Sequence, residues 1–438
     1  MRKIYLLLVV FALVGNLFSY SLLDKDDGNM VNNPDARLGA MGGAGTGGST
    51  NLMGTLLNPA NLSTLEERAG VQFTAGVMKN DDDRSLAMYD FFDGYVGDAT
   101  YASNTNFYDE YSIAGYYSNK MNELNFAAAI SYNPFLDFNV NYEEEVRNDA
   151  NSDGNSYPHV LAYNLIEGEG TVNALGYTLA ATFQNKYSLG LYFAMLSGDN
   201  DYSNEIHWTE YAHQEVKPNF ILTDSISTEN IEYEGSMIKF GAQYKLNERV
   251  NFGFSFQPEI ELDATSELDS ITTEYTHNLP SQLRAGVVYM PRNIARTYFN
   301  MDVEIVDWES ISSAYDKTIN YYIGVEHKFQ YGVPLRFGFR YVTEYRAQAG
   351  EYAEKITSPT FTAGSGFKLM NNLMLDLSFE FTNREYEDMD LFMDSFYEDQ
   401  DPNEESGLWI NISPEDRTAP DTVSENLMKV QTSLTYKW

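Results

Sequence analysis

The side chains best suited to bind a ligand are three arginines, Arg284, Arg336 and Arg340. Each lies in a segment that alternates between apolar and polar residues, and each falls on the polar side. A guanidinium group presents its donors in a rigid fork and can pair a carboxylate through two hydrogen bonds. These arginines are therefore candidates to bind a ligand carboxylate. The commoner alternative is a balanced network of charges within a protein wall, shared with Asp302, Glu304, Glu326, Lys328, Asp376 and Glu380.

The remaining polar residues do not indicate an enzyme. Of the five histidines only His327 falls within an expected strand, so no Ser–His–acid constellation can be assembled. The sequence has no cysteine and hence no thiol chemistry. Acidic runs such as 81–83 and 143–145 lack the spaced ligands and the glycine of a calcium loop. We therefore expect no catalytic residue, no metal site and no cofactor.

A glycine-dense stretch covers residues 36–49 and includes Gly42 and Gly43. A phosphate-binding loop would need a Gly-Lys-Ser/Thr sequence and a preceding strand, and this stretch has neither. It could be a flexible linker, or it could pack inside a barrel, where close approach of two backbones requires glycine. Downstream, the sequence reads Asn58, Pro59 and Ala60. These residues are expected either to anchor such a plug to the wall or to gate passage.

The start of the chain has the pattern of a secretory signal peptide. Arg2 and Lys3 precede an apolar run over residues 4–18, which is too short for a membrane-spanning helix. Beyond residue 20 no apolar run approaches the roughly 20 residues that such a helix needs. We therefore expect a signal peptide over residues 1–20, a glycine-rich plug over 21–70 and a β-barrel over 71–438.

Alternation of apolar and polar residues predicts an all-β fold. Alternating segments of about ten residues are the signature of strands in a transmembrane barrel. Fourteen can be identified, and an even number is what a closed antiparallel bacterial barrel requires. They begin near Val71, Tyr111, Leu124, Val172, Lys186, Ser236, Arg249, Ser281, Arg296, Ile319, Val333, Thr360, Asn372 and Leu427.

The spacing of these segments indicates how they are connected. From the second onward, short turns alternate strictly with long spacers, the five longest being 79–110, 134–171, 197–235, 258–280 and 383–426. Bacterial outer-membrane barrels have short periplasmic turns and long extracellular loops. The sequence thus predicts a fourteen-stranded antiparallel transmembrane β-barrel with a small N-terminal plug in its lumen and both termini in the periplasm.

The eleventh expected strand shows which side faces lipid. Phe337 and Phe339 share one side, whereas Arg336 and Arg340 share the other. An arginine facing hydrocarbon at the midplane costs about 2–4 kcal/mol. The apolar sides of the strands are therefore expected to face lipid and the charged sides the lumen.

Most of the net charge of −36 lies in four of the long spacers. Binding to nucleic acid needs a basic footprint, so nucleic acid is excluded as a partner. The simplest role of the acidic spacers is to keep the outer surface solvated. The alternatives are bridging of divalent cations to lipopolysaccharide and a filter against anions.

Motifs spread over the chain occur in a characteristic order. Residues 38–44 read Leu-Gly-Ala-Met-Gly-Gly-Ala and residues 57–62 read Leu-Asn-Pro-Ala-Asn-Leu. Residues 129–135 and then 278–289 and 334–341 follow as strand motifs. Together they resemble the FadL/TodX family of outer-membrane transporters of hydrophobic compounds. Residues 49–53 depart from this pattern, because an acidic stretch is usual there. The plug motifs also occur in a PorV-like branch that serves protein secretion.

The resemblance implies passive uptake of hydrophobic compounds such as long-chain fatty acids across the outer membrane. Such a molecule would be captured at extracellular loops, held above the plug and released sideways at a bend of the third strand, at Asn133 and Pro134. The simpler interpretation is that these two residues merely end that strand. The PorV-like branch implies instead a component of a secretion system without small-molecule transport. The expected partners are a fatty-acid-like molecule, outer-membrane lipid and lipopolysaccharide, and the chain is expected to be a monomer.

Overall fold

The computed structural model describes residues 21–31, 35–92, 94–147, 159–215, 221–292, 296–330, 332–349, 354–392 and 420–438. The expected signal peptide and most of the expected spacer 383–426 lie outside this part of the chain. None of the helices in the described ranges is long and apolar enough to cross a membrane.

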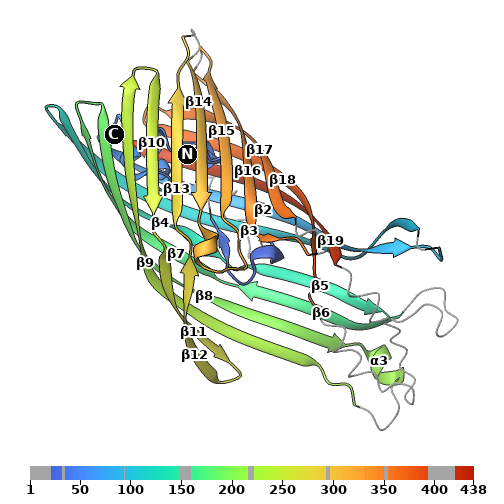
Figure 1. The fold of residues 1–438 in the computed structure, drawn as a ribbon. Helices are drawn as coiled ribbons and strands as arrows, with labels where there is room; N and C mark the ends of the chain where they lie inside the picture. The colour runs from blue at the N-terminus through green and yellow to red at the C-terminus, as the bar shows by residue number, and fades with distance from the viewer. Residues whose placement is uncertain are drawn as a thin grey trace.

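Fourteen strands form a closed antiparallel barrel (Figure 1), as the sequence predicts. Each pairs with its two neighbours around the wall, and β19 closes the circle by pairing with β2. In order they are β2 (Ala69–Tyr89), β3 (Tyr95–Met121), β4 (Leu124–Asp137), β7 (Thr171–Phe183), β8 (Tyr187–Trp208), β9 (Ser225–Asn247), β10 (Val250–Gln257), β13 (Gln282–Tyr289), β14 (Thr297–Val306), β15 (Thr318–Lys328), β16 (Pro334–Ala347), β17 (Lys355–Met370), β18 (Leu373–Asp388) and β19 (Asp421–Lys437).

The two rims of the barrel differ, and we call them the turn rim and the loop rim. At the turn rim the strands are joined by short turns, in which Asn122, Gln184 and Asn185 have φ angles of +51° to +53°. The C-terminal Trp438 lies at the same rim, where its backbone exchanges hydrogen bonds of 3.0 and 3.2 Å with Ala69. The loop rim carries the long connections.

Side chains on the barrel strands alternate between the outside and the lumen. On β16, Phe337 is 55% exposed on the outer side, whereas Arg336 is 2% exposed on the inner side. The expected division into an apolar outer side and a charged inner side is therefore confirmed for this strand.

Beyond the wall, the strands continue at the loop rim as a crown. The hairpin of β5 (Val140–Arg147) and β6 (Val160–Glu169) adds to β8, and the hairpin of β11 (Ile260–Leu268) and β12 (Ile271–Leu279) adds to β9. The spacers 79–110, 134–171, 197–235 and 258–280 are thus largely strand, and the expectation of loops there was wrong. Many of their outward residues are acidic or polar, for example Glu232 and Glu234 on β9, so their alternation is weaker than that of lipid-facing segments.

The wall is interrupted beside β4. The ladder between β3 and β4 ends at the pair Ile113 and Tyr132, although β4 continues to Asp137. The freed edge of β4 is taken by β1 (Asn29–Met30), whose Met30 lies opposite Leu136. On the other edge, the pairing with β7 shifts register between Pro134 and Leu136, which marks a bulge.

Two segments from the N-terminal part of the chain fill the lumen (blue in Figure 1). We call residues 35–64 the plug; it contains α2 (Ala36–Gly39), η2 (Met53–Thr55) and η3 (Pro59–Thr64). We call residues 21–31 the strap; it contains η1 (Leu22–Asp24) and β1. The remaining helices of the described ranges are α3 (Glu210–Glu215) in the crown and η4 (Trp308–Ser310) at the loop rim.

Candidate functional site

Glycines on the inner side of the wall allow the plug backbone to touch the barrel. A Cβ atom on Gly253 would overlap the backbone of Thr46, and one on Gly338 would overlap the backbone of Gly42. Gly42 has a φ of +64° and lies against β16, so a side chain there would be both strained and obstructed. Gly43 also has a positive φ, +79°. The plug is therefore in direct backbone contact with the wall.

Asn58 joins the plug to the wall through its side chain. The residue is fully buried, and its Oδ1 accepts a hydrogen bond of 3.1 Å from the backbone N–H of Ala60, which caps η3. Its Nδ2 donates to the carbonyl oxygens of Thr46 at 2.8 Å and of Ala242, in β9, at 3.1 Å. Pro59 follows at the first position of η3, where its missing N–H is not needed. These contacts have the geometry of an anchor.

Arg284 lies on the barrel wall where the wall contacts the plug. Its Nη2 donates to the carbonyl oxygen of Gly43 at 2.6 Å and to Asp302 Oδ2 at 3.0 Å. Asp302 in turn accepts hydrogen bonds from the backbone N–H groups of Gly45 and Thr46, at 2.9 and 3.0 Å. Arg284 thus binds a carbonyl oxygen of the plug, and Asp302 binds two of its backbone N–H groups.

The other two candidate arginines are paired with acids of the wall. Arg336 lies 2.7 Å from Glu326 and 2.6 Å from Asp376, and Arg340 pairs with Glu380. These ion pairs agree with the alternative of a charge network within the wall. Arg336 lines neither of the two lumen cavities described next, whereas Arg340 lines one of them.

Two cavities adjoin in the lumen between the plug and the strap. The larger has a volume of about 200 Å³ and is lined mainly by polar and charged residues such as Arg340 and Lys429. The smaller, of about 80 Å³, is lined about equally by apolar residues and by polar or charged ones. Met30, Gln282 and Glu304 line both, so the two cavities meet at these side chains.

The smaller cavity lies directly beside the bend in β4, because Asn133 and Phe135 are part of its lining. Asn133 is 6% exposed, and its Oδ1 has no hydrogen-bond partner within the described ranges. A buried acceptor without a partner is unfavourable. It is therefore available to a ligand that brings a donor. The other apolar lining residues are Met30, Val31, Leu56, Leu57, Tyr192 and Met237.

Lys239 is a cation at this smaller cavity that the sequence analysis did not single out. Its Nζ donates to the carbonyl oxygen of Leu56 at 3.0 Å. Among the described residues no carboxylate lies within 4.0 Å of it, whereas the neighbouring Arg284 lies 3.0 Å from Asp302. The residue opposite Lys239 on β8 is Tyr192, which is not an acid. A lysine on the lumen side without an acid opposite it is the signal that could have identified this residue.

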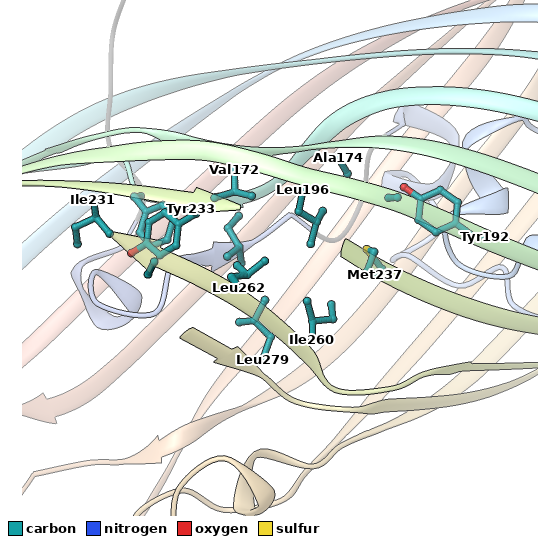
Figure 2. Packing of buried hydrophobic residues seen from close by; sticks show 14 residues of the cluster. Val172, Ala174, Tyr192, Leu196, Ile231, Tyr233, Met237, Ile260, Leu262 and Leu279 are labelled. Carbon is teal, nitrogen blue, oxygen red and sulfur yellow. The ribbon is translucent and has the colours of Figure 1, made fainter. Parts of the chain in front are cut away.

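The lumen walls around the cavities differ in chemistry. One side, formed by β7, β8, β9 and β11, presents the apolar cluster of Figure 2, which includes Leu196 and Met237. The opposite side, formed by β16, β18 and β19, presents ion pairs such as Arg384 with Glu425 at 2.5 Å. A ligand in the lumen therefore meets hydrocarbon on one side and paired charges on the other.

The strap crosses the lumen at the loop rim and packs against both walls. Leu22 belongs to a cluster with Tyr142 and Trp208 of the crown, whereas Leu23 packs with Tyr386 and Val423. These contacts tie the two sides of the crown together through one short segment.

Asp27 holds the middle of the strap. It accepts hydrogen bonds from the hydroxyl of Tyr345 at 2.6 Å, from Arg346 Nη2 at 2.8 Å and from the hydroxyl of Tyr315 at 3.3 Å. Burial alone would raise the pKa of Asp27, but the hydrogen bonds and the positive charge of Arg346 hold it below its ordinary value. Asp27 is therefore an ionised anchor.

No group of three or more potential metal ligands is found in the described ranges. His207 lies in β8 and His277 in β12, so the expectation that only His327 falls within a strand was wrong. His207 lies in the crown beside Glu205 at 2.7 Å and Asp224 at 3.1 Å.

Comparison with solved structures shows which known barrels share this fold. No protein-family model matches the sequence, and no curated protein matches it. Among solved structures, a FadL homologue from Pseudomonas aeruginosa matches with a TM-score of 0.61 and 14% identity, over 94% of this chain and 99% of the other. The toluene transporters TodX of P. putida and TbuX of Ralstonia pickettii match with TM-scores of 0.57 and 0.56 and identities of 13% and 15%, at the same coverage. The chain thus has the fold of FadL- and TodX-type barrels.

Proposed function

We propose that the protein is an outer-membrane channel for passive uptake of hydrophobic compounds, with the turn rim in the periplasm and the loop rim outside. The observation that carries the proposal is the cavity beside the interrupted wall at β4, one half of whose lining is apolar. The structures that share the fold are named as transporters of toluene or as a FadL homologue, which supports the same class of cargo. Outer-membrane lipid and lipopolysaccharide surround the barrel, and one chain forms one channel.

The route leads from the loop rim through the larger cavity into the smaller one and then sideways at Asn133 and Pro134. Sideways release keeps an apolar molecule out of water, because the molecule passes from the apolar side of the cavity directly into hydrocarbon. A proline and a bulge both weaken pairing at this point of the wall. In the structure β1 covers the freed edge of β4, so β1 must move before cargo leaves.

The cavity favours a cargo with a small polar end. Lys239 can receive a carboxylate, and Asn133 Oδ1 can accept a hydrogen bond from a hydroxyl. Arg284, Arg336 and Arg340 already have acids as partners, and breaking a buried pair is costly. A fatty-acid-like molecule therefore places its head at Lys239 and its chain along Leu56, Leu57 and Met237. The roles of Gly42, Gly43, Asn58, Pro59 and Ala60 are to keep the plug seated beneath it.

Binding of dodecanoate and of dodecanol to the purified protein, before and after Lys239→Gln, tests this assignment. We expect the substitution to weaken dodecanoate binding about tenfold, equivalent to about 1.4 kcal/mol, and to leave dodecanol binding unchanged. Lys245→Gln on the same strand is the matched control, because Lys245 lies near the turn rim and away from the smaller cavity. Equal weakening by both substitutions would contradict the role of Lys239.

Uptake by cells tests the function itself. A strain that lacks the protein should take up radiolabelled dodecanoate or toluene more slowly, and the protein should restore the rate. Normal uptake in that strain, together with co-purification of the protein with components of a secretion system, would instead favour the secretion role of the PorV-like branch.

A further inference from the structure

We infer that the smaller lumen cavity binds fatty acids that carry a hydroxyl group close to their carboxylate, and that Gln257 and Asn133 select them. Gln257 donates a hydrogen bond to the carboxylate beside Lys239, and Asn133 accepts one from the hydroxyl. All three residues line this cavity. The inference rests on the proposed uptake of fatty-acid-like compounds and defines their class more narrowly.

Gln257 and Lys239 are neighbours on the wall of this cavity. Strands β9 and β10 pair in register up to Phe240 and Phe256, and Lys239 and Gln257 are the next residues beyond that pair. Phe240 and Phe256 are exposed on the outer side of the barrel, so the residues next to them face the lumen. Side chains opposite each other on paired strands lie close enough to bind one group together. A carboxylate at Lys239 is therefore within reach of the amide of Gln257.

The cavity lining offers one unused donor and one unused acceptor. Gln257 is 2% exposed, and its Nε2 has no hydrogen-bond partner among the described residues. Asn133 is 6% exposed, and its Nδ2 donates to the carbonyl oxygen of Pro134 at 3.0 Å, whereas its Oδ1 has no partner in the same part of the chain. Buried polar atoms without a partner are unfavourable, so a ligand that supplies both partners gains affinity.

The remaining charged and amide side chains of the lining are already bound. The pairs are Gln282 with the sulfur of Met30 at 3.4 Å, Arg284 with Asp302 at 3.0 Å and Glu304 with the hydroxyl of Tyr322 at 2.5 Å. A plain fatty acid supplies acceptors for Lys239 and Gln257 but no donor for Asn133. A hydroxylated fatty acid supplies both. Because the cavity measures only about 80 Å³, the hydroxyl must lie close to the carboxylate.

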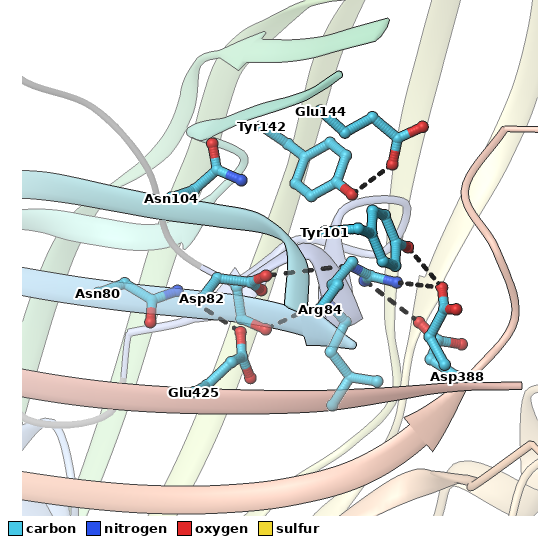
Figure 3. A network of polar contacts seen from close by, with 12 residues as sticks. Asn80, Asp82, Arg84, Tyr101, Asn104, Tyr142, Glu144, Asp388 and Glu425 are labelled. Carbon is cyan, nitrogen blue, oxygen red and sulfur yellow. Dashed lines mark hydrogen bonds and ion pairs between the residues drawn. The ribbon is translucent and has the colours of Figure 1, made fainter. Parts of the chain in front are cut away.

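Buried polar atoms without a hydrogen bond also occur near the loop rim, but there opposite charges face each other. Arg84 is fully buried, and its guanidinium lies 3.6–3.9 Å from carboxylate oxygens of Asp82, Asp388 and Asp421 (Figure 3). A small movement of these side chains would close hydrogen bonds between them. Gln257 and Asn133 instead line a cavity, so a ligand can supply their partners.

Competition binding to the purified, detergent-solubilised protein tests this inference. Bound radiolabelled dodecanoate is displaced with unlabelled dodecanoate, with 3-hydroxydodecanoate or with dodecanamide. We expect 3-hydroxydodecanoate to act at a concentration about fivefold lower than dodecanoate, which corresponds to one additional hydrogen bond. Equal displacement by the two acids, or stronger displacement by dodecanamide, would overturn the inference and leave the proposed uptake of fatty acids standing. If dodecanoate itself did not bind, fatty acids would fail as cargo and this inference with them.

Two variants separate the roles of Asn133 and Gln257. Asn133→Leu should abolish the preference for the hydroxylated acid and leave dodecanoate binding intact, which also shows that the variant is folded. Gln257→Leu should weaken binding of both acids about fivefold and preserve the preference. A preference that survives Asn133→Leu, or binding of both acids that is unchanged in Gln257→Leu, would contradict the inference.

Asn300→Leu is the matched control for Asn133→Leu. Asn300 is also 6% exposed, its Oδ1 likewise has no partner within the described part of the chain, and its Nδ2 donates to the carbonyl oxygen of Ala44 at 3.2 Å. It lines neither of the two lumen cavities. The preference for 3-hydroxydodecanoate should therefore be unchanged in Asn300→Leu, and its loss there would contradict the role of Asn133.

Discussion

The plug and the strap both lie in the lumen, but they are held there in different ways. The plug meets the wall backbone to backbone, through glycines on both partners such as Gly42 and Gly338. The strap meets the wall through side chains, for example Leu23 in an apolar cluster and Asp27 in a group of hydroxyl and guanidinium donors. Backbone contacts of this kind leave no room for an added side chain, whereas side-chain contacts can be released by rotation about single bonds.

Because their contacts with the wall differ, we expect the plug and the strap to have different roles. For the proposed channel we therefore expect the plug to stay seated and the strap to move when cargo passes. The edge of β4 supports this division, since β1 pairs there through only two residues, Asn29 and Met30. A ladder that short is readily undone.

The largest effect on channel conductance is expected from a side chain added where the plug backbone touches the wall. In Gly253→Val the new side chain would overlap the backbone of Thr46, and overpacking of this kind costs about 1–3 kcal/mol. We expect the plug to be displaced and the ion conductance of single channels in planar bilayers to rise severalfold. Gly115→Val is the control, because a Cβ there meets only ordinary contacts at 3.6 Å or more. A tight channel in Gly253→Val would show that the plug does not depend on glycine contact.

A smaller effect is expected from Asn58→Ala. The substitution removes the cap of η3 and leaves the carbonyl oxygens of Thr46 and Ala242 without this donor. Loss of such a cap costs roughly 0.5–2 kcal/mol, so the thermal midpoint should fall while the plug stays seated. Asn383→Ala, in an exposed pair with Asn426, should leave the midpoint unchanged. If conductance rises as much as in Gly253→Val, Asn58 gates the channel as well as anchoring the plug.

The smallest effect is expected from Asp27→Asn, which releases one ionic anchor of the strap. Because Asp27 is partly exposed, its loss should cost only about 1 kcal/mol. Brief openings of single channels in planar bilayers should become more frequent, with only a small fall in the thermal midpoint. Asp26→Asn, at a more exposed neighbour 3.7 Å from Arg346, is the control. If openings were equally frequent in Asp27→Asn and Asp26→Asn, Asp27 would not be the anchor of the strap.

The pH dependence of the same openings follows from the lowered pKa of Asp27. A carboxylate with a lowered folded pKa stabilises the folded contact above its ordinary pKa of 3.8 and loses that contribution as the pH falls through the folded value. The frequency of single-channel openings of the unmodified protein should therefore increase only below about pH 4. In Asp27→Asn this increase should be absent.

The barrel could be predicted from the sequence because lipid enforces its pattern. Phe337 and Arg336 are adjacent residues with opposite environments, and hydrocarbon tolerates no exception at that depth. The crown lacks that constraint. Glu232 and Glu234 on β9 face outward into water, where a loop would carry the same residues, so the hairpins there were mistaken for loops.

The site could be predicted only in part. The sequence identifies Gly42 and Asn58 as plug residues, because glycine density and an Asn-Pro pair are local signals. Their partners on the wall are not local signals, since Gly253 lies in a strand like any other. The strap is still less predictable: Asp27 and Tyr345 are 318 residues apart, and a strand of two residues has no periodicity. Lys239 was missed because only the paired wall reveals that no acid lies opposite it.

The central claim is that cargo leaves beside β4 after β1 has moved, and a reversible lock tests it most directly. The chain has no cysteine, so Met30→Cys with Leu136→Cys, at directly opposite positions of β1 and β4, introduces a single disulfide. Uptake of radiolabelled dodecanoate by cells that carry this variant should stop on oxidation and return on reduction. Unchanged uptake with the disulfide fully formed would contradict the account.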